Sequence, residues 1–259
     1  MQSNPVLRSL LSTRGRNRKL GRAVYSWSIP PVETCPGRTG LCQLICYARK
    51  MASRFTHIRK TWRANLNLSE RPDFSDLLTS ALISIRQIEQ KRQGGVESIP
   101  LRIHVSGDFY SPEYIHSWMK ALHQANLSNA GPVIRPWGYT RIWRVPWLAT
   151  AVHVYSMYLR TFWPGWLWCS SDLETGPPPK WAPEARMIPR PAPATREELW
   201  KWRLRMVQDR RICPVIDSQL TRRQQTTTCQ ECGRCWDATR CPSPRHSRGR
   251  GQVIVFPQH

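Results

Sequence analysis

Two groups of cysteines are the residues of this chain best suited to chemistry. Seven of the nine cysteines belong to them. The first group is Cys35, Cys42 and Cys46, and the second is Cys213, Cys229, Cys232 and Cys235. Thiolates are soft ligands that select zinc, copper(I) or iron–sulfur clusters. We therefore interpret the chain as a metalloprotein whose metal largely decides its function.

The first group has three thiols with short gaps, in a loop expected to follow a strand at Ala23–Ile29. Three cysteines suit a [4Fe-4S] cluster in which the fourth iron stays open to a small molecule. A zinc ion would need a fourth protein ligand. None lies adjacent, and His57 is the nearest candidate.

The second group contains a CxxCxxC run, which is typical of ferredoxin-like cluster sites. With the more distant Cys213 it offers four thiols, and Cys241 is a spare ligand. This group predicts an auxiliary [4Fe-4S] cluster, with a four-thiolate zinc ion as the alternative. Cys169 lies in an apolar strand pattern and is interpreted as a core residue.

The charge of the chain points to polyanionic partners. Its 259 residues include 39 Lys and Arg against 17 Asp and Glu, a formal net charge of +22. Such an excess favours nucleic acid, although a merely solvated basic surface is the alternative. Basic side chains expected to contact phosphates gather near both ends and in the segment after the first cysteines: Arg14, Arg16, Arg18, Arg49, Arg59, Lys60, Arg63, Arg245, Arg248 and Arg250.

The sequence also indicates a compartment. No apolar run is long enough to span a bilayer, and the basic N-terminal segment lacks the pattern of a secretory signal. Clustered cysteines without an export signal favour a reducing environment over a disulfide scaffold. We expect a cytoplasmic protein without a membrane partner; the sequence names no protein partner.

Strands and helices alternate along the chain, which predicts an α/β fold with a parallel sheet, open or barrel-like. Residues 1–22 are expected to be a flexible basic arm, residues 23–212 the α/β unit, and residues 213–259 a cysteine-bound metal-binding segment. Strands are expected at Ala23–Ile29, Leu101–Val105, Val133–Tyr139, Trp166–Ser170, Ala185–Ile188 and Val253–Phe256. Helices are expected at Tyr47–Leu66, Phe74–Arg92, Pro112–Ala125, Pro146–Leu159 and Arg196–Gln208.

Polar residues follow two of these strands. Ser106-Gly107-Asp108 closes the strand at Leu101–Val105, and Tyr139, Thr140 and Arg141 follow the next strand. Ligands of α/β folds gather at the carboxyl ends of the strands. An Asp in this position also caps helices, but Ser111, just before Pro112, is the better candidate for the cap. Asp108 is therefore a candidate site residue. For Tyr139, Thr140 and Arg141, a role in structural packing is an equal alternative.

The position of the first cysteine group resembles that in radical S-adenosylmethionine enzymes, which carry three cysteines after the first strand of a partial α/β barrel. Their usual gaps are three residues and then two, whereas the gaps here are six and then three. The resemblance implies a partial (β/α) barrel and S-adenosylmethionine as cofactor. It implies that Ser106, Gly107, Asp108 and Thr140 contact the cofactor. Asp108, Tyr139 and Arg141 would then be catalytic.

Longer motifs resemble the gene-product-88-like proteins of phages and plasmids. They are TCPGxxxLC…CYARK at Thr34–Lys50, LRIHVSGDFYSPEYIHSW at Leu101–Trp118, GYTR at Gly138–Arg141 and CxxCGRCW at Cys229–Trp236. The resemblance extends from Val24 to Trp236 and implies architecture and cluster ligands rather than a reaction.

The sequence therefore leads to two hypotheses. The first is an iron–sulfur enzyme of radical S-adenosylmethionine type that modifies nucleic acid in a phage or plasmid. The alternative is a non-catalytic, zinc- or cluster-stabilised DNA- or RNA-binding protein. An open three-cysteine site favours the enzyme, because a purely structural site is closed by four ligands.

Overall fold

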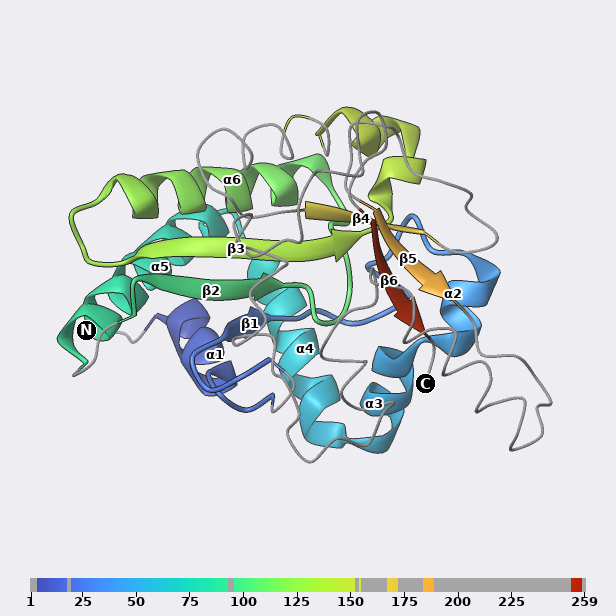
Figure 1. Ribbon diagram of the computed structural model, residues 1–259, viewed down its shortest axis with the longest axis horizontal. Coiled ribbons are helices and arrows are strands. Elements are labelled where there is room, and N and C mark those ends of the chain that lie inside the picture. The colour runs from blue at the N-terminus through green and yellow to red at the C-terminus, as the bar shows by residue number, and fades with distance from the viewer. Residues whose placement is uncertain are drawn as a thin grey trace.

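A parallel sheet forms the centre of the molecule (Figure 1). The computed structural model describes residues 4–17, 20–92, 96–151 and 154, and the backbone of residues 167–171, 184–188 and 253–257. β1 (Tyr25–Trp27) pairs with β2 (Ser98–Ile103), which pairs with β3 (Val133–Thr140), all parallel.

The backbone of three further strands continues this sheet in chain order. They are β4 (Leu167–Ser171), β5 (Glu184–Ile188) and β6 (Val253–Pro257), each parallel to its neighbour. β1 and β6 are the outer strands, so the sheet is open among the strands that the structure describes. The α/β class expected from the sequence is confirmed, whereas closure toward a barrel is not shown.

The helices precede or connect the first three strands. They are α1 (Pro5–Thr13), α2 (Gly40–Ile45), α3 (Tyr47–Arg54), α4 (Thr56–Ser69), α5 (Phe74–Lys91) and α6 (Pro112–Leu127), and a 3₁₀ turn, η1, covers Ile142–Arg144. Residues 146–151 are also helical. None of the helices in the described residues is both long enough and apolar enough to cross a membrane.

The core lies where α1, α5 and α6 pack together against β1, β2 and β3. Helix α5 buries Leu78, Ala81, Leu82 and Ile85, an i, i+3, i+4, i+7 stripe that identifies the helix in the sequence. Helix α6 begins at Pro112, and the Ser111 hydroxyl accepts a hydrogen bond from the amide of Tyr114 at 3.2 Å. Ser111 is therefore the helix cap, as predicted, and Asp108 is not.

The N-terminal segment is not the flexible basic arm that its charge predicted. Residues Pro5–Thr13 form α1, which Asn4 caps and whose Val6 and Leu10 are fully buried in the core. The local signals were present, because Asn before Pro starts helices and two apolar residues four apart form a buried stripe. The arginines that follow the helix masked these signals.

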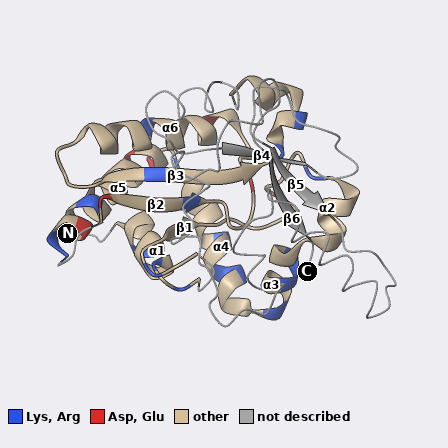
Figure 2. Cartoon of the chain, in the orientation of Figure 1, with Lys and Arg blue, Asp and Glu red and all other residues tan. Residues whose placement is uncertain are grey.

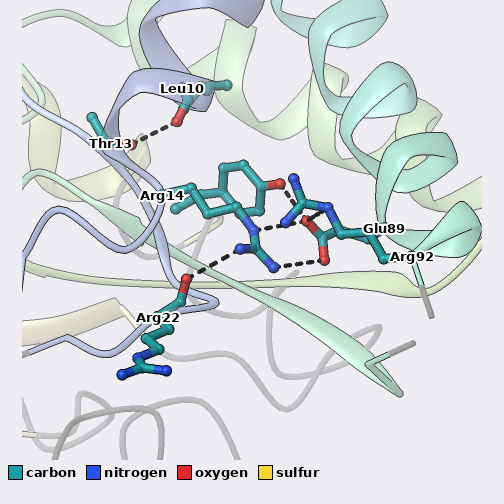
Figure 3. A network of polar contacts seen from close by, with 7 residues as sticks. Leu10, Thr13, Arg14, Arg22, Glu89 and Arg92 are labelled. Atoms are coloured by element: carbon teal, nitrogen blue, oxygen red, sulfur yellow. Dashed lines mark hydrogen bonds and ion pairs between the residues drawn. The ribbon is translucent and has the colours of Figure 1, made fainter. Parts of the chain in front are cut away.

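A buried network fixes the chain after α1 to α5 (Figure 3). The Arg14 guanidinium donates to both carboxylate oxygens of Glu89, at 2.8 and 3.1 Å, and the Tyr25 hydroxyl donates to the same carboxylate at 2.5 Å. Glu89 is only 2% exposed, and Arg92 approaches it at 3.4 Å. Arg14 was expected to contact phosphates, but its guanidinium is already committed to this carboxylate.

Two further local differences concern the region after β1. The expected loop around the first cysteines contains the short helix α2. The single helix expected over Tyr47–Leu66 is two helices, because the chain leaves the helical conformation at Phe55, between α3 and α4. Phe55 is neither Gly nor Pro, so the sequence gave no sign of the break.

Candidate functional site

The segment between β1 and α3 carries the first three cysteines. Thr39 starts α2, since its hydroxyl accepts a hydrogen bond from the Cys42 amide at 2.9 Å. Cys46 starts α3 in the same way, with its sulfur 3.5 Å from the Arg49 amide nitrogen. Cys35 lies in the turn before α2. All three cysteines are partly buried, and none of them forms a disulfide.

The Cys35 thiol lies in the interior of this segment. Burial is the main reason that its pKa is raised to about 12, and the charge of Asp108 and the neighbouring Cys42 and Cys46 contribute in the same direction. The three thiols are thus near enough to act on one another electrostatically. The described part of the chain nevertheless contains no group of three or more His, Cys, Asp or Glu arranged around a single metal ion. Convergence of the three sulfurs on one cluster therefore stays a prediction.

Asp108 joins the loops that follow the first three strands. Its amide donates to the Thr34 carbonyl of the cysteine segment at 3.1 Å. Its carboxylate accepts from the Phe109 amide at 2.8 Å, the Thr140 hydroxyl at 2.6 Å and the Arg141 amide at 2.8 Å. Asp108 is 5% exposed, and burial raises its pKa to about 6 although these hydrogen bonds lower it. Its first role in this structure is to hold loops together.

Two glycines allow these loops to approach so closely. A Cβ atom on Gly37 would lie 2.1 Å from the carbonyl oxygen of Arg141. Gly107 has a φ of +79°, and a Cβ atom there would lie 2.3 Å from Ile29 Cγ1 and 2.7 Å from Thr34 Oγ1. Both positions lack room for any side chain, and Gly107 also needs the left-handed conformation.

The structure brings most of the predicted pocket residues to this edge of the sheet, but their side chains are buried in the interior of the protein. The exposed fractions of Ser106, Thr140 and Arg141 are 3%, 1% and 6%. The Arg141 guanidinium lies 3.3 Å from the Thr39 hydroxyl, on the same segment as the cysteines. Tyr139 is different, because its ring faces another part of the sheet, against Trp137.

Comparison with known proteins identifies the group to which the chain is related. Residues 8–238 match the family described as Gene product 88. The chain belongs to the Gene product 88 family. The cysteine segment, Asp108 and Arg141 all lie within the matched region.

Two mycobacteriophage proteins illustrate the relationship. The chain is 29% identical over 134 residues to the Gene 88 protein of Mycobacterium phage L5, and 28% identical over 134 residues to that of Mycobacterium phage D29. Each match covers 50% of this chain and 52% of the relative, so the chain spans about half the length of the curated relatives it matches. No solved structure matches the chain. The radical S-adenosylmethionine resemblance finds no support in these matches.

Two residues beside this edge were missed by sequence reasoning. Arg102, on β2 of this family member, lies against the rings of Trp137 and Tyr139. Tyr47 follows Cys46 directly, and its hydroxyl donates to the Val105 carbonyl although the residue as a whole is 57% exposed. Burial of the hydroxyl raises the Tyr47 pKa, while the charge of Arg102 lowers it. The only sequence signal was an Arg within an otherwise apolar strand.

His104, which lies among apolar residues in the sequence, is a core residue and is only 3% exposed. Its Nε2 lies 3.0 Å from the Tyr114 hydroxyl, and its ring packs edge-on against Phe109 at 4.4 Å. Burial, together with the nearby charge of Arg102, lowers the pKa of His104 to about 3. His104 has a φ of +58°, and its contact with Tyr114 places its ring against α6.

The second cysteine group lies outside the described residues. This applies to Cys213, Cys229, Cys232, Cys235 and Cys241, and equally to the arginines of the tail. The side chain of Cys169, on β4, is not described either. The predicted C-terminal metal site is therefore still a prediction.

Proposed function

We propose that this Gene product 88 family member is an iron–sulfur protein, of the radical S-adenosylmethionine type, that acts on or binds nucleic acid in a phage or plasmid. One observation carries the proposal. The loops after β1, β2 and β3 meet at the carboxyl edge of the sheet, where α/β folds bind ligands, and the first of them brings three cysteines.

The donor set suits an iron–sulfur cluster. Cys35, Cys42 and Cys46 would be the ligands, since their thiols act on one another and no disulfide occupies them. A bound cluster would supply one-electron chemistry. The protein would contribute a shielded position, because burial of Cys35 limits the access of water to one side of the site.

The surrounding residues would hold the cysteine segment in position. The Asp108 amide donates to the Thr34 carbonyl at 3.1 Å, its carboxylate accepts from the Arg141 amide at 2.8 Å, and Arg141 reaches the hydroxyl of Thr39. Thr39 in turn caps the helix that carries Cys42. The ligand-bearing segment is thus anchored at two points to the strands behind it.

S-adenosylmethionine does not fit the role expected of Asp108. A contact with the cofactor amino group requires a carboxylate that is not already engaged, but both carboxylate oxygens of Asp108 accept hydrogen bonds from the protein, three in all. The sequential strand order, β1 to β6, supports the partial barrel as part of the proposal.

Nucleic acid is the partner favoured by the surface beside the cysteines. Helix α3 starts directly after Cys46, α4 follows it after Phe55, and Figure 2 shows basic residues along both. We call the exposed basic side chains of these helices the basic face: Arg49, Lys50, Arg54, Arg59, Lys60 and Arg63. Arg63 pairs with Glu33 at 2.7 Å, and the sequence from Tyr47 to Arg63 contains no acidic residue. Such a surface complements a phosphate backbone.

Anaerobic purification with iron, sulfide and zinc analysis tests the metal. We expect iron and acid-labile sulfide, with the iron content falling in C42S and C46S. C169S is the matched control, since Cys169 belongs to neither group. Colourless protein with zinc alone would refute the proposal.

A salt series tests the partner. Electrophoretic shift assays with DNA and RNA should give affinities that fall steeply with salt, because counterions are released. The double variant R59Q/K60Q should flatten the slope of log K against log salt by about 1.8, or 0.9 for each lost phosphate contact. R8Q/K91Q, which removes two exposed charges elsewhere, should leave the slope unchanged. Equal effects of the two doubles would argue against the basic face.

The non-catalytic alternative is favoured by the burial of Asp108 and Arg141, which act as structural groups here. In that form the protein is a zinc- or cluster-stabilised nucleic-acid-binding protein. It predicts zinc or a redox-inert cluster together with the salt dependence described above. Electron paramagnetic resonance after dithionite reduction separates the two, because only a reducible cluster gives a signal.

A further inference from the structure

Arg102 occupies an unusual position on the sheet. Its guanidinium carbon lies 4.2 Å from the ring centroid of Trp137 and 3.9 Å from that of Tyr139. These two rings stand at 82° to each other, so the guanidinium lies in an aromatic corner. Arg102 is only 9% exposed.

The register of the strands fixes this corner. Arg102 pairs with Trp137, and Tyr139 lies two residues further along β3 on the same face. The adjacent Leu101 pairs with Tyr25, and both are buried in the core with the helices. Arg102 therefore belongs to the other face of the sheet from α5 and α6.

Among the described residues, the buried Nη1 of Arg102 has no hydrogen-bond partner. None of the ion pairs among the described residues includes it, and the buried carboxylates Asp108 and Glu89 are engaged elsewhere. Arg86 shows the contrast. It is equally buried, at 3% exposed, but its guanidinium donates to the backbone carbonyls of Ala125, Ser128, Gly131 and Pro132.

A buried guanidinium nitrogen without an acceptor is costly, and the two rings against Arg102 do not remove that cost for its Nη1. Cation–π contacts stabilise the charge, but they give no acceptor to the N–H groups of Nη1, which lie in the guanidinium plane. The group that satisfies such a planar fork best is an oxyanion with two parallel oxygens, a carboxylate or a phosphate.

We propose that Arg102, held between Trp137 and Tyr139, binds the carboxylate or phosphate group of a small ligand at the face of the sheet beside the cysteine segment. The hydroxyl of Tyr47, which follows Cys46, donates to the carbonyl of Val105, three residues beyond Arg102, so this site lies beside the cysteine segment. Burial of Arg102 favours a small anion over duplex DNA, whose backbone is contacted by exposed side chains such as those of the basic face. The site does not depend on which metal, if any, the cysteines hold.

Titration calorimetry with two probes tests the proposal and separates the sources of the anion. Inorganic phosphate represents phosphate esters, and succinate represents carboxylates. We expect the wild-type chain to bind one of them with a Kd of about 1 mM or tighter. R102M, which keeps an apolar side chain against the rings, should lose at least about tenfold in affinity.

Two further variants make the result specific. R102K keeps the charge but lacks the planar fork, so it should also bind more weakly. R8M removes an exposed arginine of α1 and should bind like the wild type, which excludes a general effect of charge. Melting curves check the fold, and R102M should melt no lower than wild type without anion, since it removes an unsatisfied buried charge.

Two outcomes would overturn the proposal. One is that R102M binds the effective probe as tightly as the wild type and R8M. The other is that neither anion binds the wild-type chain at millimolar concentrations. If R102M loses the anion but keeps its affinity for nucleic acid and its iron content, the Arg102 site stands apart from the proposed function and survives its failure.

Discussion

Replacement of Gly37 by alanine tests whether the cysteine segment is seated on the end of β3. The new Cβ atom would lie 2.1 Å from the Arg141 carbonyl oxygen and 2.5 Å from its carbonyl carbon. Ordinary contact begins at 3.4 Å, so the two backbones must separate by about 1.3 Å. Neither atom belongs to a flexible side chain, and the strain cannot be relieved by a rotamer change.

The separation would break hydrogen bonds that join the loops. The Arg141 amide is 2.8 Å from the Asp108 carboxylate, and the Asp108 amide is 3.1 Å from the Thr34 carbonyl. A movement of 1.3 Å takes either contact past hydrogen-bond length. Overpacking costs about 1–3 kcal/mol and a lost hydrogen bond about 1 kcal/mol, so we expect a total of about 2–4 kcal/mol. For a domain of this size the Tm should fall by about 5–15 °C.

Gly40→Ala in the same segment is the control. Gly40 is the exposed first residue of α2 and does not have a positive φ, so alanine should leave stability unchanged or raise it by up to about 1 kcal/mol. Thermal and urea denaturation of both variants measure the difference, and iron content after anaerobic purification shows whether the cysteine segment has moved. If Gly37→Ala has the same Tm as Gly40→Ala and the wild type, the close approach of these loops is not a feature of the folded protein.

The remaining predictions concern the two buried carboxylates. Glu89→Ala leaves the charge of Arg14 without its partner and should lower the free energy of unfolding in urea by about 3 kcal/mol. Glu113→Ala, on the exposed side of α6, is the control and should change this free energy by less than about 0.5 kcal/mol. Equal losses in the two variants would refute the role of the network. Asp108 has a pKa raised from 3.8 to about 6, so it stabilises the fold below pH 4 and loses this contribution as the pH rises through 6. The stability of the wild type relative to Asp108→Asn should therefore fall by about 3 kcal/mol between pH 4 and pH 7, and a pH-independent difference would contradict the assignment. The comparison with Asp108→Asn is essential because His104 has the opposite effect. Its pKa is lowered to about 3, so its contribution to stability falls as the pH drops below 6.5.

Local patterns in the sequence determined much of the fold. The apolar stripe of α5 and the Ser111-Pro112 start of α6 predicted these helices closely. Alternation of strands and helices predicted the parallel sheet, and Val253–Phe256 is indeed part of its last strand. These features depend on residues within one or two turns of each other, so their signals lie in short windows of the sequence. The motifs at Thr34–Lys50 and Leu101–Trp118 likewise pointed to the Gene product 88 family.

The three-dimensional structure decided how these elements meet. The sequence placed Gly37, Asp108 and Arg141 after the ends of different strands. It could not show that the Asp108 carboxylate is hydrogen-bonded to the neighbouring loops rather than facing a ligand. It gave no sign that Arg102 lies against Trp137 and Tyr139 with its Nη1 unpartnered among the described residues, because this depends on the register between β2 and β3. Spacing along the chain predicts which residues share a face or an edge. Burial, partners and close backbone contacts arise only when segments far apart in the chain pack together, and they decide which polar residues stabilise the fold and which can bind a ligand.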